Sequence, residues 1–251
     1  MNSQNETFIS HLTELRYRLM ISLSVLLIGF FMCFYIADYI FNFLTTPLVD
    51  VFGDISNRRL IYTGLAEKFF TNVKLAFFAS FMIMFPILLS QIWAFIAPGL
   101  YKNEKRVFFP FLIMTPVLFF IGSAFVYYFV LPIAWDFFVG FEQIGNNSTL
   151  AIQLESKVDE YLSLVMQLIF AFGLAFELPI LLLLLVQVGI TDAEGLKKKR
   201  KYAILISFVV SAILTPPDPL SQIGLAIPMI LLYEASILIA ILMKKNKNKE
   251  R

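Results

Sequence analysis

The sequence predicts an all-α membrane protein of six transmembrane helices, with both termini on the cytoplasmic side, an open cupped arrangement, and short fifth and sixth helices. Three observations predict this class. Of the 251 residues, 59% are hydrophobic and only 15% are charged, whereas a soluble domain has about 25% charged residues. The apolar residues gather into six segments, and the basic residues gather on alternate loops. We expect the whole chain, residues 1–251, to form a single integral membrane domain.

The apolar segments differ in length, which bears on their arrangement. Crossing the hydrocarbon core takes about 20 apolar residues. The segments lie at residues 19–36, 69–96, 107–132, 161–188, 202–214 and 221–243. The fifth segment reaches only about 20 Å as a helix, so we expect it to thin the bilayer or to be covered by a partner. The long second and fourth segments contain Pro86 and Pro179, which favour bent helices.

The basic residues set the predicted orientation. Fifteen Lys and Arg residues lie in the N-terminal tail, in the loops after the second and fourth segments, and in the C-terminal tail. Far fewer, among them Arg58, Arg59 and Lys157, lie in the opposite loops. Because an excess of positive charge marks the cytoplasmic side, both termini are expected there, and six spans agree with that parity.

Glu177 is the only ionisable residue in the run FAFGLAFELPILLLLLVQV at residues 170–188. A carboxylate near the bilayer centre costs about 2.5–3.5 kcal/mol on insertion scales, so a chain retains one by facing it inward. Pro179 removes a backbone donor two residues later and is expected to bend the helix beside the acid. We interpret Glu177 as a functional intramembrane site; a protonated packing residue is the alternative.

Several classes of chemistry are excluded by composition. Cys33 and His11 are the only cysteine and histidine, so neither a zinc site, an iron–sulfur site nor a Cys–His pair can form within the chain. The sequence has no P-loop, no GxSxG turn and no HExxH helix. We therefore expect no catalytic residues, no metal, no cofactor, no nucleic-acid partner and no enzymatic activity.

Two acids stand out among the cytoplasmic loops, which are otherwise basic. Glu14 lies four positions before Arg18 in a stretch with helical spacing of leucines, and Glu104 follows a Pro98-Gly99 turn. Each acid has an ordinary explanation: Glu14 can pair with Arg18 on the helix surface, and Glu104 can interact favourably with the dipole of the helix that it opens. Together they form an acidic spot suited to a basic peptide, with arginine as the natural partner because guanidinium pairs with carboxylates in bidentate fashion. On the opposite side, Pro47 is expected to break a short interfacial helix.

Four motifs resemble the TatC family, the polytopic component of the twin-arginine protein translocase. They are HLTELRYRL at residues 11–19, QIWAFIAPGLYKNEKR at 91–106, AFGLAFELPI at 171–180, and LTPPDPLSQIGLAIPMILLYE at 214–234. The motifs occur in the order of the family, and the resemblance runs from about residue 8 to residue 243. It implies recognition of folded proteins that carry a twin-arginine signal peptide, and their movement across an energised membrane with the proton gradient.

The resemblance also implies residue roles and partners. The implied residues are Glu14, Arg16, Phe95 and Glu104 for binding the signal peptide, Glu177 as the intramembrane acid, Pro47 and Asp218 as sensitive outer-loop positions, and Thr215 and Gln222 for docking partner subunits. One departure is Pro219, directly after Asp218, where many relatives have another apolar residue. The implied partners are TatA-like and TatB-like single-span subunits, twin-arginine signal peptides, the lipid bilayer and further copies of the chain, in a bacterial plasma (inner) membrane.

One other function remains open on the residues alone, and a second is disfavoured by them. A proton- or ion-coupled small-solute transporter would use Glu177 as its coupling site, but it predicts broken helices in both halves of the chain and leaves Glu14 and Glu104 unexplained. An intramembrane protease would need a second carboxylate beside Glu177.

Overall fold

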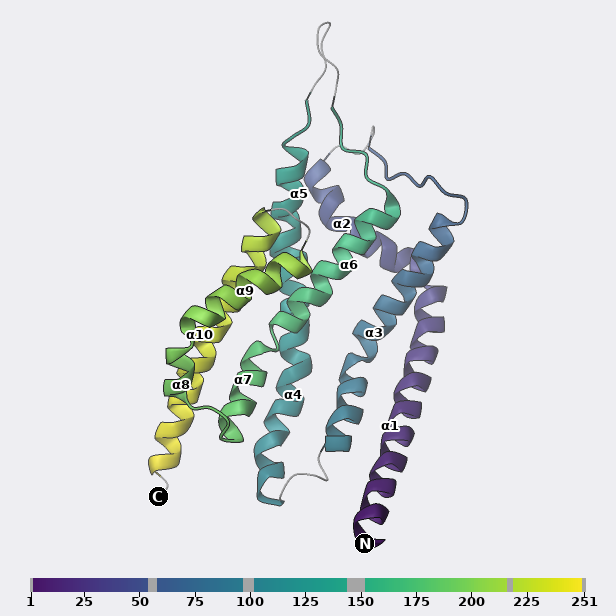
Figure 1. Ribbon diagram of the computed structural model, residues 1–251. Helices are drawn as coiled ribbons and strands as arrows, with labels where there is room; N and C mark the ends of the chain where they lie inside the picture. Colours follow the sequence, from purple (N-terminus) through teal and green to yellow (C-terminus); the bar gives the residue numbers. More distant parts are fainter. Residues whose placement is uncertain (1, 54–57, 97–101, 144–151, 216–218, 250–251) are drawn as a thin grey trace, which may run out of the picture. The chain divides into compact units, whose positions relative to one another are not determined.

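The computed structural model describes residues 2–53, 58–96, 102–143, 152–215 and 219–249, with side chains outside the description at 2–10, 96, 102–109, 220 and 245–249 (Figure 1). The elements are α1 Asn2–Tyr35, α2 Ala37–Phe52, α3 Glu67–Ile96, α4 Lys102–Phe125, the π-helical turn η2 Val126–Val130, α5 Leu131–Val139, α6 Val158–Ala175, α7 Leu178–Gln187, α8 Ala193–Lys198, α9 Arg200–Leu214 and α10 Pro219–Lys249. In these ranges the β-structure consists of two isolated bridges. The all-α prediction is confirmed.

Five helical stretches of the described chain are long and apolar enough to cross a membrane: His11–Tyr35, Glu67–Phe95, Pro110–Val139, Val158–Gln187 and Ser221–Lys244. The predicted fifth span corresponds to α9, whose 15 residues rise only about 22 Å. It is short, as expected. The prediction of a short sixth helix is wrong, because α10 has 31 residues. Its apolar part runs on into a lysine-rich tail, and lysine is a good helix former. The cytoplasmic termini and the cupped arrangement stay predictions.

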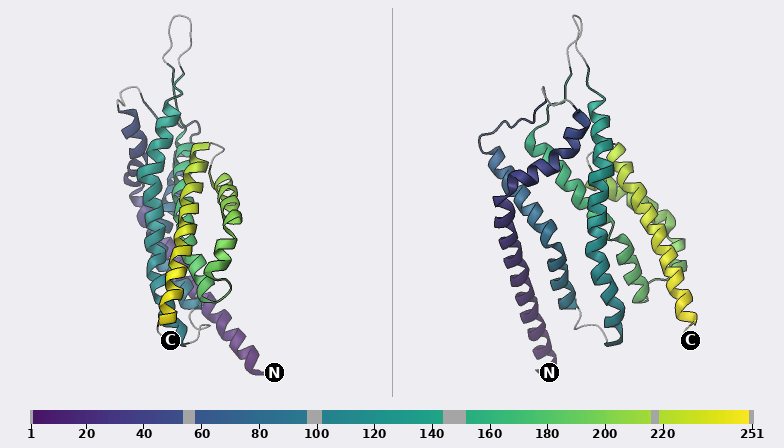
Figure 2. Two further views of the ribbon diagram at one scale, coloured as in Figure 1. Left: turned by 90° about the vertical axis from the view of Figure 1, so that its left-hand side faces the viewer. Right: turned by 180° about the vertical axis from the view of Figure 1, so that it is seen from behind.

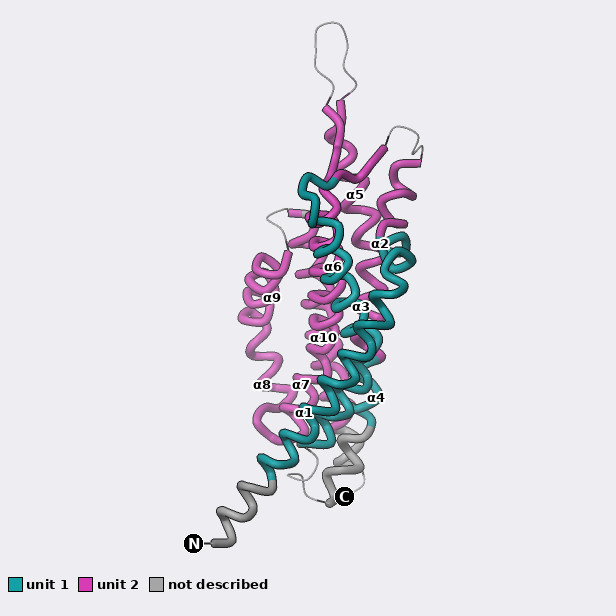
Figure 3. Tube along the Cα trace, turned by 90° about the vertical axis from the view of Figure 1, so that its right-hand side faces the viewer, with its two compact units in different colours: residues 1–44, 62–116 teal, residues 45–61, 117–251 magenta. Residues whose placement is uncertain are grey.

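Contacts among the described residues divide the chain into two compact units, residues 1–44 with 62–116 and residues 45–61 with 117–251 (Figure 3). In the first unit α1 packs along α3 (Figure 1). The Ser80 hydroxyl on α3 donates to the Leu26 carbonyl on α1 at 2.9 Å. Gly29 faces Ser80 so closely that an added Cβ would lie 2.6 Å from its Oγ. The two backbones approach because both residues are small.

In the second unit small residues again allow close approach. A Cβ at Gly122 of α4 would lie 2.5 Å from the Phe172 carbonyl oxygen on α6, and one at Gly173 would lie 2.6 Å from the Phe119 ring. Helices α9 and α10 run side by side (Figure 2). They are joined by the Ser211 hydroxyl, which donates to the Gln222 carbonyl at 2.8 Å.

The predicted bend at Glu177 is confirmed. The fourth apolar segment is two helices, α6 and α7, separated by a turn at Phe176 and Glu177. The Glu177 amide donates to the Leu174 carbonyl at 3.0 Å, three residues back rather than four. Pro179 lies in the first turn of α7, where its missing N–H leaves the carbonyl four residues earlier without its usual donor.

The prediction that Pro47 breaks a helix is wrong. Helix α2 is 16 residues long and passes through Pro47 to Phe52. A proline removes one intrahelical hydrogen bond, but its fixed φ suits a helix. Pro47 and Leu48 are buried, and packing of this face offsets the lost bond.

The third apolar segment extends further than predicted. It runs through η2 and continues past Pro132 along α5 to Val139. Pro132 lies in the first turn of α5, directly after the π-helical turn. A proline there cannot donate to the carbonyl four residues earlier, so a local change of helix register accommodates it without ending the helix.

Candidate functional site

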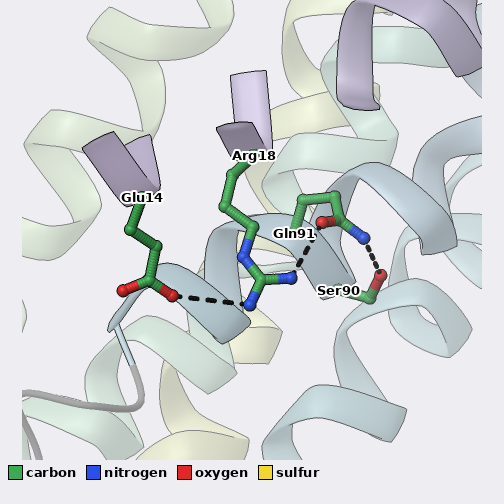
Figure 4. A network of polar contacts seen from close by, with 4 residues as sticks. All are labelled: Glu14, Arg18, Ser90 and Gln91. Carbon is green, nitrogen blue, oxygen red and sulfur yellow. Dashed lines mark hydrogen bonds and ion pairs between the residues drawn. The ribbon is translucent and has the colours of Figure 1, made fainter. Parts of the chain in front are cut away.

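A polar network joins α1 to the end of α3 in the first unit (Figure 4). Arg18 donates from Nη2 to Oε1 of Glu14 at 3.4 Å and from Nη1 to Oε1 of Gln91 at 3.2 Å. The Gln91 amide in turn donates to the Ser90 hydroxyl at 3.4 Å. Glu14 and Arg18 share a face of α1 because residues four apart are neighbours on a helix.

Glu14 is held loosely in this network. Its single contact with Arg18, at 3.4 Å, is long for a hydrogen bond, and the side chains of Glu14 and Arg18 are 31% and 29% exposed. Such helix-surface pairs are worth only about 0.3–0.5 kcal/mol. Within the described residues the second oxygen of Glu14, Oε2, has no hydrogen-bond partner. The carboxylate can therefore accept a ligand cation at little cost.

Arg18 carries an unfilled donor. Its Nε atom is buried and has no hydrogen-bond partner among the residues that the structure describes. The guanidinium is thus anchored by its two terminal nitrogens, one toward Glu14 and one toward Gln91. Arg18 sits between the acid of α1 and the amide of α3 and fixes the spacing of the two helices at this end.

Phe95 lies next to this network. Its ring stacks on the His11 ring, with centroids 4.4 Å apart and an interplanar angle of 18°. His11 is exposed and Phe95 is half-buried. The pair forms an apolar surface one turn of α1 before Glu14 and one turn of α3 after Gln91. The structure therefore brings two of the predicted peptide-binding residues, Glu14 and Phe95, to the same end of the α1–α3 pair.

The structure describes only some of the other predicted site residues. Arg16 is exposed on α1, two residues from Glu14. Glu104 lies in the first turn of α4, but its side chain is outside the described residues. Of the two outer-loop predictions, Pro47 is buried within α2, and Asp218 lies outside the described residues.

Glu177 is far more buried than Glu14. It is 8% exposed and forms the N-cap position of α7. The turn that contains it interrupts the most buried of the apolar stretches, Val158–Gln187. This placement agrees with an acid that faces protein and not lipid.

The two predicted docking residues differ in accessibility. Thr215 is 5% exposed, and its hydroxyl donates to the Ser211 carbonyl at 2.8 Å. Gln222 is partly exposed, and its amide lies 3.5 Å from the Phe208 carbonyl. In this chain by itself, Gln222 offers the more accessible polar group.

Sequence reasoning missed three members of the α1–α3 network as site residues: Arg18, Ser90 and Gln91. A signal was present, because Ser90 and Gln91 are polar residues inside an apolar run. Their partner was not predictable, since Gln91 and Arg18 are 73 positions apart. Among the described residues no group of His, Cys, Asp and Glu side chains is placed to hold a metal ion.

Comparison with known proteins agrees with this architecture. The family described as Sec-independent protein translocase protein (TatC) matches residues 10–228. The chain is 49% identical over 234 residues to a TatC of Magnetococcus marinus, covering 93% of this chain and 83% of the relative. It is 39% identical over 246 residues to TatC of Escherichia coli, covering 98% and 92%.

A crystal structure described as the twin arginine translocase receptor TatC is also similar. It superposes with a TM-score of 0.76 at 42% identity, covering 92% of this chain and 98% of that one. The apolar helices and the bacterial relatives define the class: a multi-pass bacterial membrane protein of a protein translocase. The chain belongs to the TatC family. The comparisons support the function of a protein translocase subunit and not that of a small-solute transporter.

Proposed function

We propose that this translocase subunit recognises twin-arginine signal peptides at the end of the α1–α3 pair. The observation that carries the proposal is the Glu14 carboxylate, which is partly exposed and touched by Arg18 through one oxygen at 3.4 Å. A ligand arginine can form two parallel N–H···O bonds with such a carboxylate, and charge-assisted pairs of this kind are stronger than neutral hydrogen bonds. A ligand lysine can offer only a point charge.

The surroundings of Glu14 favour a peptide that combines basic residues with a hydrophobic stretch. The stacked rings of His11 and Phe95 offer apolar surface near the acid, which suits a hydrophobic stretch following the arginines. Glu104 at the start of α4 is proposed as the second acid, so that each arginine of the pair has a carboxylate. Arg16 is proposed to position the peptide and limit binding to segments that carry enough positive charge.

The remaining roles follow from the family and are proposals of the same kind. TatA-like and TatB-like subunits are the proposed partners, docked near Thr215 and Gln222, and several copies of the chain assemble in the complex. The proton gradient drives transport, and the protein performs no covalent chemistry. Glu177, buried at a helix break, serves the transport step and not peptide recognition, while Pro47 and Asp218 shape the outer face.

Binding of a fluorescent twin-arginine signal peptide to the detergent-purified protein tests the proposal. We expect Glu14→Gln and Glu104→Gln each to weaken binding by about tenfold or more, as for loss of a charged hydrogen bond. A peptide with Lys-Lys in place of Arg-Arg should weaken binding similarly. Glu155→Gln, which removes an acid from the other unit, is the matched control and should bind as the wild type does.

Two results would contradict the proposal. If wild-type protein binds the peptide and neither acid matters, recognition lies elsewhere on the chain. If Glu155→Gln weakens binding as much as Glu14→Gln does, the acids act through net charge and not as a site.

A further inference from the structure

We propose that the junction of α8 and α9 binds the phosphate head groups of anionic lipids. We call this surface the basic corner; it consists of Lys197, Lys198, Lys199, Arg200 and Lys201. All five side chains are exposed. The basic corner belongs to the second unit, and the proposal does not depend on the peptide-binding role given to Glu14 in the first.

The basic corner is a rigid feature. Helix α8 is capped by Asp192, whose Oδ1 accepts from the Gly195 amide at 2.8 Å. It is held against α10 by the Tyr233 hydroxyl, which donates to the Leu196 carbonyl at 2.8 Å. Leu196 itself is 3% exposed. The lysines therefore project from a fixed turn, and ordering them for a ligand costs less entropy than ordering a loose tail.

Most of the positive charge here has no acidic partner. Arg200 pairs with Glu234 of α10 at 2.6 Å, and nearby Lys244 pairs with Glu194 at 3.7 Å. In the described part of the chain no salt bridge engages the four lysines of the basic corner, Lys197, Lys198, Lys199 and Lys201. The Lys201 ammonium instead lies 5.1 Å from the centre of the Tyr202 ring. The corner thus holds four uncompensated positive charges.

The positions of Lys199 and Lys201 are unfavourable for α9 by itself. Lys199 is the N-cap residue of α9 and makes no side-chain capping bond, and the first turn contains no acid. Helix N-termini favour anions and disfavour cations, because their backbone N–H groups carry a partial positive charge. A chain that retains cations there gains stability when an external anion neutralises them.

An apolar surface continues directly from the basic corner. Tyr202 is 55% exposed, and further along α9 Leu205, Val209 and Ile213 are 62%, 49% and 72% exposed. A phospholipid has the same order of parts, a phosphate followed by acyl chains. An acidic protein segment would satisfy the lysines but would leave this apolar face uncovered, so the combination favours a lipid.

The length of α9 fits the same ligand. A helix of 15 residues spans about 22 Å, against about 30 Å of hydrocarbon. Its basic end can meet head groups only where the bilayer thins locally or where long lysine side chains reach outward. Each lysine near an anionic surface adds to lipid attraction, and four of them concentrate it at one point.

Lipid binding to the purified full chain tests the proposal. The probe is fluorescent phosphatidylglycerol, titrated into detergent-solubilised protein beside phosphatidylcholine with the same chains. We expect phosphatidylglycerol to bind about tenfold more tightly, and the variant with Lys197, Lys198, Lys199 and Lys201 all changed to Gln to lose that preference. Circular dichroism and retained signal-peptide binding confirm that the variant is folded.

A second variant of equal net charge provides the control. Arg59, Lys68, Lys74 and Lys157 are changed to Gln together, which should leave the lipid preference unchanged. An equal loss in both variants would overturn the proposal, because net charge alone would explain the attraction. Displacement of the lipid by an equal concentration of a poly-glutamate peptide or of inorganic phosphate would also overturn it, since the corner would then bind anions without regard to the acyl chains.

Discussion

Arg58 and Glu142, which are 84 positions apart in the sequence, form a bidentate ion pair that joins two loops. Arg58 donates from Nη1 and Nη2 to the two carboxylate oxygens, the second at 2.6 Å. Glu142 also accepts from the Leu154 amide at 2.8 Å, and the guanidinium of Arg58 lies over the Phe52 ring, 4.6 Å from its centre. The pair is about one-fifth exposed, so solvent screens it less than a surface pair.

Replacing Glu142 should loosen these loops. Glu142→Gln removes the charge that Arg58 contacts, and we expect a loss of about 1–3 kcal/mol, as for a hydrogen bond to a charged group. Thermal unfolding in detergent measures the loss. Glu155→Gln is the control, because the Arg59–Glu155 pair is largely exposed; its unfolding midpoint should stay close to the wild type. Equal shifts in the two unfolding midpoints would show that the Arg58–Glu142 pair stabilises the protein no more than the exposed Arg59–Glu155 pair does.

The same pair predicts a dependence of stability on pH. The hydrogen bonds from Arg58 hold the pKa of the Glu142 carboxyl below its ordinary value of 4.5, against the opposing effect of burial. Because the folded pKa is lowered, the stabilisation is fully present above pH 4.5 and is lost as the pH falls through the folded pKa. Unfolding midpoints measured from pH 7 downward should fall less steeply below pH 4.5 for Glu142→Gln than for the wild type. Parallel curves would contradict the assignment.

Gly122 and Gly224 should respond oppositely to alanine. A Cβ at Gly122 would lie 2.5 Å from the Phe172 carbonyl oxygen, a backbone atom that cannot turn aside. We expect Gly122→Ala to cost about 1–3 kcal/mol by overpacking. At Gly224 the nearest atom would be 3.6 Å away, so Gly224→Ala should be neutral or stabilising by up to about 1 kcal/mol. Unfolding midpoints compare the two, and a stable Gly122→Ala would mean that α4 and α6 can separate.

Ser211 and Ser207 provide a matched test of the contact between α9 and α10. Both hydroxyls are buried, but Ser211 donates to Gln222 on α10, whereas Ser207 donates to Ala203 within α9. Ser211→Ala should cost about 1 kcal/mol, since it removes a hydrogen bond that joins α9 to α10. Ser207→Ala should cost less, because its hydrogen bond lies within α9 and does not join that helix to a second one. The comparison is made by thermal unfolding, and a larger loss for Ser207→Ala would count against this account.

Gln91 should tune peptide binding through Arg18. Without the Gln91 carbonyl, Arg18 is free to pair more closely with Glu14, so the peptide must displace a better-held cation. Gln91→Leu is expected to weaken binding of the twin-arginine peptide about two- to fivefold, in line with a modest ion pair. Ser90→Ala is the control, because the Ser90 hydroxyl donates to the Ile87 carbonyl at 2.6 Å and does not contact Arg18 among the described residues. Peptide binding to Ser90→Ala should therefore match the wild type. Tighter binding by Gln91→Leu would overturn this prediction.

Within the candidate site, some residues were predictable and others were not. Glu14 and Arg18 are four apart on one helix, so their pairing follows from helical geometry. The family motifs pointed to Phe95. The contact of Arg18 with Gln91 and the stacking of His11 on Phe95 depend on the register of α1 against α3, and the helical period of either segment alone does not determine that register.

The amino-acid sequence is enough to predict a helical membrane protein with a short fifth segment and a bend beside Glu177. Those properties are local, because apolar length, proline position and charge distribution each act within a few helical turns. Three other features could be seen only in the folded chain. Helix α2 passes through Pro47, α10 extends to 31 residues, and distant residues such as Arg58 and Glu142 meet. These outcomes depend on packing between segments far apart in the chain, where burial outweighs local backbone preference.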